Sequence, residues 1–319
     1  MMRRLNMREI HKTEDILLLA KALDSPLRMS IINILIEKKQ MNLSDLSEEL
    51  NVTNGALTSH IKILKEADLI DIMNLSSGKR GSQKVCLINE NKFLIDMTLR
   101  NNNANAYEVE LPVGTYSNYC AAPTCGLATS TSIVGEFDNP RYFDDPMRYN
   151  ASIIWLSHGF FEYRIPNYLD ASQKPVEMQI SLELSSEAPG YSEEWPSDIN
   201  FSINDHSLGF WTSPGDFGKT RGLFTPNWWP SMCNQYGILK LLTINKKGSF
   251  VDGLKVSDVT IDDVEIFNKS NIIFKIAVLE DSPHMGGLTL FGKSFGNYPQ
   301  GIRVRIEYEI QQKSPASVV

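Results

Sequence analysis

The first hundred residues show apolar positions at helical spacing. Such side chains recur at intervals of three and four at Ile16, Leu17, Leu19, Ala20 and Leu23, and this period predicts a helix over 14–22. Ser25 followed by Pro26 predicts the start of a second, strongly apolar helix, because serine caps free N–H groups and proline fits the first helical turn. A short third helix is expected over 45–50 after Ser44, and Thr53 is expected to cap a fourth.

The fourth predicted helix has an apolar back and a small polar front. The back is formed by Ala56, Leu57, Ile61 and Leu64, and the front by Asn54, Gly55, Thr58, Ser59 and Lys62. Two short helices joined by a tight turn, the second with such a front, are typical of a helix-turn-helix. Small side chains let the backbone approach the base edges of DNA, whereas Lys62 and Lys65 can reach phosphates.

A basic hairpin is predicted after the fourth helix. The runs 72–74 and 85–88 are strand-like, and a Gly-containing loop joins them. Lys79, Arg80 and Lys84 lie on or beside this loop. We expect the hairpin to form a wing that touches the DNA backbone or the minor groove.

The helices and the hairpin together resemble the winged helix-turn-helix of ArsR-type transcriptional regulators over about residues 12–98. The matching positions are Pro26, Arg28, Leu43, Leu46, Ser59, His60, Leu64, Ala67 and Leu69. The resemblance implies that Asn54, Gly55, Thr58 and Ser59 form the recognition face, that the partner is a double-stranded DNA operator, and that the protein is a homodimer built on its terminal helices. Metal-sensing relatives carry Cys-x-Cys before the turn, but 43–48 holds no Cys or His and 90–105 holds no His. Metal sensing by this domain, and any cofactor, is therefore not expected.

The composition changes near residue 105, and this change predicts two domains. Residues 1–105 hold 15 Lys and Arg against 13 Asp and Glu, net +2, whereas the remainder holds 16 against 25, net −9. All five Trp, all eleven Tyr and 14 of the 15 Pro residues follow residue 105. We predict a DNA-binding domain over 1–100, a polar hinge over 101–106 and a second domain over 107–319.

The second domain is predicted to be all-β. Apolar or alternating runs lie between turn signals at 107–113, 153–155, 160–165, 176–184, 199–203, 238–244, 255–261, 272–278, 288–291 and 302–310. About ten strands without a long helix predict an antiparallel sandwich or jelly roll. The fold class is thus multidomain α+β.

Two long connections, 185–199 and 209–236, suggest a ligand site in the second domain, because loops of that length are usually functional. They are rich in aromatic residues that stand beside polar ones. Such a set suits a sugar, which presents an apolar C–H face and a rim of hydroxyl groups. The candidate ligand residues are Trp195, Asp198, Trp211, Asp216, Arg221, Trp228, Trp229, Asn234 and Gln235.

Two other functions are open for the second domain. Cys120 and Cys125, with His158 and Cys233, have residue types that bind zinc or sense redox state, although no second closely spaced pair accompanies them. A hydrolase is the other alternative, with Glu183 and Glu187, or Asp198 and Asp216, as paired carboxylates. Free thiols are favoured over a metal site, and no enzymatic activity is expected.

The chain is expected to be cytoplasmic. Its 319 residues are 42% hydrophobic and 22% charged, its start runs directly into charged residues, and no apolar run approaches about 18 residues. The sequence therefore favours a DNA-binding regulator that is controlled by a small polar effector, for which a sugar or oligosaccharide is the first choice.

Overall fold

The chain forms two compact units, Met1–Asn101 and Asn102–Val319. The computed structural model describes residues 8–10, 12–76, 82–89, 93–95, 105–267 and 269–311. Each unit is described by itself. Among the described residues, no helix has both the length and the apolar character needed to cross a bilayer.

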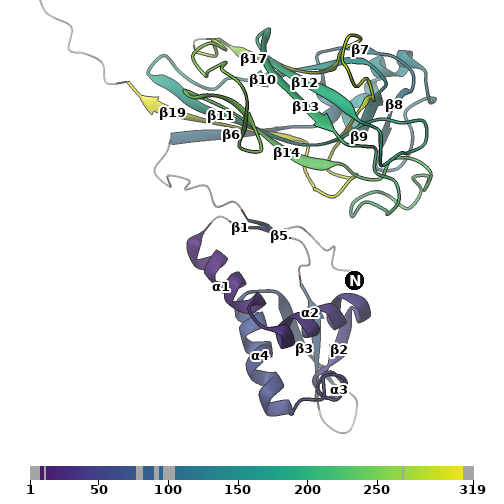
Figure 1. Cartoon of the computed structure of the whole chain (residues 1–319), viewed down its shortest axis with the longest axis vertical. Coiled ribbons are helices and arrows are strands. Elements are labelled where there is room, and N and C mark those ends of the chain that lie inside the picture. The colour runs from purple at the N-terminus through teal and green to yellow at the C-terminus, as the bar shows by residue number, and fades with distance from the viewer. Residues whose placement is uncertain are drawn as a thin grey trace, which may run out of the picture. The chain divides into compact units, whose positions relative to one another are not determined.

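The N-terminal unit is helical with a small sheet (Figure 1). Its helices are α1 (Thr13–Leu23), α2 (Pro26–Lys38), α3 (Leu43–Glu49) and α4 (Asn54–Glu66). Its strands are β1 (Arg8–Ile10), β2 (Gln40–Asn42), β3 (Ile70–Ser76), β4 (Ser82–Ile88) and β5 (Phe93–Ile95). Strands β2, β4 and β3 form an antiparallel sheet in that order, and β1 pairs with β5 in parallel.

The caps show why the helices begin where they do. The side chain of Ser25 accepts the N–H of Arg28, with Pro26 in the first turn, and that of Thr53 accepts the N–H of Ala56. Both predicted caps are confirmed. The predicted start of the third helix was wrong by two residues, because Asn42 rather than Ser44 supplies the cap and accepts the N–H of Asp45 at 2.8 Å.

The C-terminal unit is an antiparallel β-sandwich. One sheet has the order β13-β12-β17-β10-β7, and the other has the order β16-β15-β14-β11-β18-β9-β8 with β19 joining β11 to β6. The strands are β6 (Asn105–Leu111), β7 (Asn118–Ala121), β8 (Cys125–Thr129), β9 (Ala151–Leu156), β10 (Gly159–Pro166), β11 (Gln173–Ser185), β12 (Ser197–Ile203), β13 (His206–Ser213), β14 (Ile238–Asn245), β15 (Gly248–Val251), β16 (Leu254–Ser257), β17 (Asn271–Val278), β18 (Leu288–Phe291) and β19 (Ile302–Ile310). Three short 3-10 turns span Val113–Thr115, Pro140–Asp144 and Pro146–Asn150.

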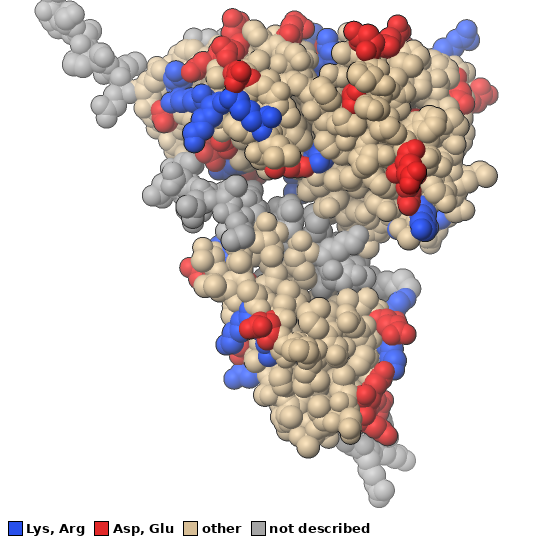
Figure 2. Space-filling model, in the orientation of Figure 1, with Lys and Arg blue, Asp and Glu red and all other residues tan. Residues whose placement is uncertain are grey.

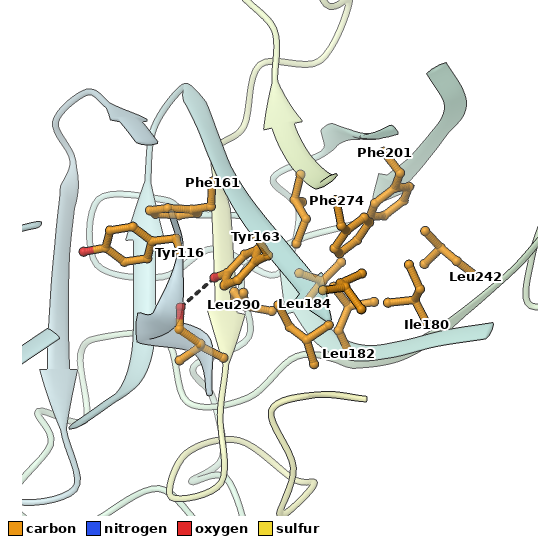
Figure 3. Close-up of a cluster of buried hydrophobic side chains, with 14 of the residues drawn as sticks. Tyr116, Phe161, Tyr163, Ile180, Leu182, Leu184, Phe201, Leu242, Phe274 and Leu290 are labelled. Carbon is orange, nitrogen blue, oxygen red and sulfur yellow. Dashed lines mark hydrogen bonds between the residues drawn. The ribbon is translucent and has the colours of Figure 1, made fainter. Parts of the chain in front are cut away.

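The main core lies between the two sheets. Alternate side chains of the facing strands are fully buried there, and Phe201 stacks on Phe274 with ring centroids 6.5 Å apart (Figure 3). The one polar group that Figure 3 shows bonded within this core is the Tyr163 hydroxyl, which donates to the carbonyl of Val113 at 2.6 Å. A buried hydroxyl that finds such a partner does not leave an unsatisfied polar group in the core.

The strand prediction was incomplete at four places. Strands β7, β8, β13 and β15 were not predicted, and the run 255–261 is strand only to Ser257. Strand β13 extends to Ser213, so Trp211 lies on a strand and not in the long loop. These strands are short or carry glycine and polar residues, so apolar alternation marks them weakly.

A second apolar cluster is separate from the main core. It joins side chains of β8, β9 and β18 to the loop that follows β13, and its buried members are Ala128, Ile153, Trp155, Trp229, Phe291 and Phe295. A Cβ on Gly126 would lie 2.3 Å from the Trp155 ring, so glycine at 126 allows that ring to cover β8. The loop 214–237 therefore packs against the sheet as an ordered layer.

Candidate nucleic-acid interface and effector pocket

Helix α4 buries one face and presents the other to solvent. Leu57, Ile61 and Leu64 are buried among side chains of the other helices. The opposite face is exposed at Asn54, Gly55, Thr58, Ser59, Lys62 and Lys65. The helical period thus places all the predicted recognition residues on one open surface, which we call the α4 front.

Polar groups on the α4 front are already ordered by the helix. The Thr58 hydroxyl donates to the carbonyl of Asn54 at 2.7 Å, and the Ser59 hydroxyl donates to that of Ala56 at 2.7 Å. Each hydroxyl oxygen can still accept a hydrogen bond. Lys62 lies 3.9 Å from Glu66, and Lys65 lies 3.8 Å from Asp71, but both are exposed pairs that contribute little to stability and exchange easily for phosphate.

Arg28 connects α1 and α2 to α4. It is buried, and its guanidinium donates to the carbonyls of Ala22, Lys21 and Asp24 at 2.7, 2.7 and 2.9 Å. The same group lies 3.4 Å from Nδ1 of His60 on α4. A charged group with three carbonyl acceptors fixes the end of α1 and positions α4 against it.

The hairpin predicted as a wing is formed by β3 and β4. Their pairing runs from Ile70 opposite Ile88 to Ser76 opposite Ser82. Lys84 is exposed on β4, whereas Lys79 and Arg80 lie outside the described residues. Lys and Arg side chains lie among Asp and Glu side chains on the face that Figure 2 shows.

The C-terminal domain has a pocket of about 260 Å³ beside the second apolar cluster. One wall is aromatic, formed by Phe137, Trp155 and Trp229, whose ring centroids lie 5.6 to 6.3 Å apart. Trp155 and Trp229 are nearly fully buried, and Phe137 is 44% exposed. The polar lining comes from Thr124, Asp138, Glu187 and Asn234, and Cys233 also borders the pocket.

Glu187 is the central polar group of the pocket. It is buried, and its Oε2 accepts the Asn234 amide and the Thr289 hydroxyl, each at 2.9 Å. Burial, together with the charges of Asp216 and Asp138, raises the pKa of the Glu187 carboxyl well above its usual range. A carboxyl in this setting binds a proton readily.

Asp216 lies beside Glu187 but does not line the pocket. Its Oδ2 accepts the N–H of Ala188 at 3.0 Å, and its buried Oδ1 has no hydrogen-bond partner among the residues that the structure describes. Burial raises the pKa of Asp216 to about 7. The hydrolase alternative paired Glu187 with Glu183, and Asp198 with Asp216, whereas the structure places Glu187 beside Asp216.

The raised pKa of Asp216 gives the β-domain a pH-dependent stability. Between pH 3.8, which is the usual pKa of an aspartate, and about pH 7, Asp216 holds a proton in the folded chain that it has lost in the unfolded chain. The stability that the folded chain gains by holding this proton is fully present below the usual pKa. It is lost as pH rises toward about 7, at up to about 1.4 kcal/mol of unfolding free energy per pH unit. We expect Asp216→Asn to flatten that decline in urea unfolding between about pH 5 and about pH 7.

Asp205→Asn is the matched control, because Asp205 is exposed at the turn between β12 and β13. It should keep the slope of the unmodified chain. Equal slopes for Asp216→Asn and the unmodified chain would show that Asp216 titrates normally.

Only some of the other predicted ligand residues line the pocket. Trp229 and Asn234 line the pocket, whereas Trp195 and Trp228 are partly exposed outside its lining. Arg221 and Gln235 donate to carbonyls of the loop 226–233 and hold its shape. Asp198 accepts the hydroxyl of Thr212 and the N–H of His284, and Trp211 lies under the Lys240 ammonium at 4.4 Å. Contact of these residues with an effector stays a prediction.

Several lining residues were not predicted as ligand residues. Phe137 and Asp138 lie in a turn before the first proline-led 3-10 turn, and Trp155 lies on β9, far along the chain from the long loops. Register places Trp155 opposite Gly126, and the loop 214–237 then adds Trp229. No local sequence signal predicts that Trp155 pairs opposite Gly126 and meets Trp229.

The cysteines do not gather into a metal site. Among the residues that the structure describes, no group of three or more His, Cys, Asp or Glu side chains is arranged to hold a metal ion. Burial raises the pKa of Cys125 to about 12 and also raises the pKa of Cys233. Thiols with raised pKa values react slowly, which argues against a redox role for Cys125 and Cys233. Cys120 is exposed, and sensing through it stays a prediction.

Comparison with known proteins identifies the N-terminal domain. Residues 23–72 match the family model described as a helix-turn-helix domain. An uncharacterized HTH-type transcriptional regulator from Methanocaldococcus jannaschii is 31% identical over 85 residues, which cover 27% of this chain and 87% of that protein. Through this domain the chain belongs to the helix-turn-helix transcriptional regulators, and the resemblance seen in the sequence is confirmed there.

A solved structure also matches much of the chain. It is the CBM36-1 domain of a multidomain xylanase from the hindgut metagenome of Trinervitermes trinervoides, at 10% identity over 63% of this chain and 96% of that chain. The TM-score is 0.27, and a likeness this weak supports no statement about ligands.

Proposed function

We propose that this chain is a transcriptional regulator that binds a double-stranded DNA operator through the α4 front and the wing. The β-domain binds a small polar effector, a sugar or oligosaccharide, and thereby changes the affinity for the operator. The observation that supports DNA binding most directly is the α4 front itself, where every predicted recognition residue is exposed on one helix face. We assign it no enzymatic activity and a cytoplasmic place of action.

We propose a homodimer, because α1 leaves apolar side chains uncovered. Leu17 is 64% exposed, and Leu18 and Leu23 are each 38% exposed. Leucines that stay in contact with water within one chain favour burial against a second copy. Two copies would present two α4 fronts to the two halves of an inverted-repeat operator.

Gly55 offers a test of the α4 front that separates folding from DNA contact. A Cβ added there would have no neighbour within 4 Å, so alanine fits the free protein. Gly55→Ala should raise the free energy of unfolding by about 0.5 kcal/mol, because glycine is a poor helix former. The same variant should weaken operator binding about fivefold or more if the helix backbone approaches the bases.

The operator for this measurement is first selected from random duplexes by the unmodified protein. Thermal unfolding and fluorescence anisotropy are then measured on the same samples. If the variant is more stable but binds the operator with the same affinity as the unmodified chain, the DNA does not approach Gly55.

The pocket supports the effector proposal. Its aromatic wall can pack against the carbon face of a sugar, and the Glu187, Asn234 and Asp138 side chains can bond hydroxyl groups. Its size suits one small ligand rather than a long chain in a single cavity. A regulator needs a ligand that binds one arrangement of the chain better than another, and this pocket is a place where such a ligand can act.

A thermal-shift screen of the full chain against mono- and oligosaccharides tests the effector proposal. A ligand that binds only the folded state raises the melting temperature. Phe137→Ala should abolish the shift, and Phe210→Ala is the matched control, because Phe210 is a ring of similar exposure on β13, outside the pocket lining. If no sugar shifts the melting temperature, or both variants respond like the unmodified chain, the pocket is not a sugar site.

A further inference from the structure

The charge of the pocket restricts the ligands that fit it. Two carboxyl groups, Asp138 and Glu187, border it, and Asp216 lies directly beside Glu187. Among the described residues that line the pocket, none is Lys, Arg or His. An anionic ligand would lie near these three carboxyl groups without a counter-charge in the lining, so electrostatics disfavour phosphorylated or acidic sugars.

Within the part of the chain that the structure describes, the hydrogen bonds to these three acids come from neutral donors. Asp138 is exposed and accepts the N–H of Cys125 at 2.9 Å, and the buried Glu187 accepts hydrogen bonds from the neutral side chains of Asn234 and Thr289. The Oδ1 atom of Asp216 is buried and accepts no hydrogen bond from any described residue. Buried carboxylates are stable only when they are paired or protonated, so the pair Glu187 and Asp216 gains from any cation that enters.

The aromatic wall adds a second attraction for a cation. Three rings, those of Phe137, Trp155 and Trp229, border the same cavity as Glu187. The π-faces of Trp and Phe attract ammonium groups, and a neighbouring carboxylate strengthens this attraction. A neutral sugar can pack against the rings and form hydrogen bonds with its hydroxyl groups, but it brings no positive charge to the acids.

We propose that the pocket binds a small polar ligand through a positively charged ammonium group, with Glu187 as its counter-ion and the aromatic wall against its carbon atoms. An amino sugar combines this ammonium group with the ring and hydroxyl groups of the proposed effector. The inference rests on the proposed function for the location of the site, and it names the class of ligand. Binding transfers the proton held by the Glu187 and Asp216 pair to the buffer, because the ammonium group replaces it.

Isothermal titration of the full chain with glucosamine, glucose, N-acetylglucosamine and choline tests this inference. Glucosamine is expected to bind about tenfold or more tightly than glucose and N-acetylglucosamine, which share its ring but lack the charge. Titration in two buffers of different ionisation enthalpy should show proton release with glucosamine. If choline binds and glucosamine does not, the pocket is still an ammonium site, but its ligand is a quaternary amine. The sugar part of the proposed function would then be wrong.

Glu187→Gln removes the charge with little change in shape. It should abolish the preference for glucosamine and the proton release, and Asp205→Asn, which removes an exposed charge on the other sheet, should alter neither. Equal binding of glucose and glucosamine, or an unchanged preference in Glu187→Gln, would overturn the ammonium inference and leave the sugar proposal standing. Failure of all four compounds to bind would overturn both.

Discussion

Thr58→Asp is expected to weaken operator binding about 100-fold or more. Thr58 is exposed on the α4 front, and its side chain already bonds the carbonyl of Asn54, so the helix does not need threonine for packing. A carboxylate at this position would face the negative phosphates and the acceptor groups of the major groove, and such like-charge contact costs several kcal/mol.

Fluorescence anisotropy with a labelled operator measures this effect, and circular dichroism confirms that the variant is folded. Thr13→Asp is the matched control, because it adds the same charge at an exposed position at the start of α1, where a helix favours it. If Thr58→Asp binds the operator like Thr13→Asp and the unmodified chain, the α4 front does not enter the groove.

Glu183→Ala is expected to destabilise the β-domain by about 3 kcal/mol or more. The fully buried carboxylate of Glu183 accepts the N–H groups of Gly237, Asn297 and Tyr298 at 2.8 to 3.0 Å. Alanine would leave these donors without an acceptor in a dry environment. Gly296 has φ +76° and a Cβ there would lie 2.4 Å from the Glu183 oxygens, so the surrounding loop is built around this carboxylate.

The expected fall in melting temperature is roughly 6–12 °C for a domain of this size. Differential scanning calorimetry measures it, and Glu309→Ala, at an exposed site near the end of β19, should change the melting temperature little. A melting temperature for Glu183→Ala equal to that of the unmodified chain would show that the three N–H groups find other partners. Glu183 therefore acts as a structural anchor in this account and not as half of a hydrolase pair.

The N-terminal domain could be predicted from the sequence because its signals are local. The spacing of Leu57, Ile61 and Leu64 defines the buried face of α4, and the Ser25 and Thr53 caps mark where two helices begin. The cap of α3 was missed because Asn42 and Ser44 are both good N-cap residues and lie two positions apart. The wing strands were predicted too short, since their ends carry polar residues.

The effector pocket could be predicted only in part. The long loop 214–237 was recognised by its length and aromatic content, and Trp229 and Asn234 within it do line the pocket. Trp155 and Glu187 come into contact with this loop through the register of β8, β9 and β18, which depends on pairing between distant segments. Sequence alone also could not show that Asp216, rather than Glu183, is the acid beside Glu187.

The central claim is that a ligand bound in the β-domain changes the affinity of the N-terminal domain for DNA. The most direct measurement is the operator dissociation constant of the full chain, by fluorescence anisotropy, with and without a saturating ligand from the titrations above. We expect this constant to change about fivefold or more in the unmodified chain and not at all in Glu187→Gln under the same conditions. An operator affinity that stays the same while calorimetry shows the ligand bound would contradict it.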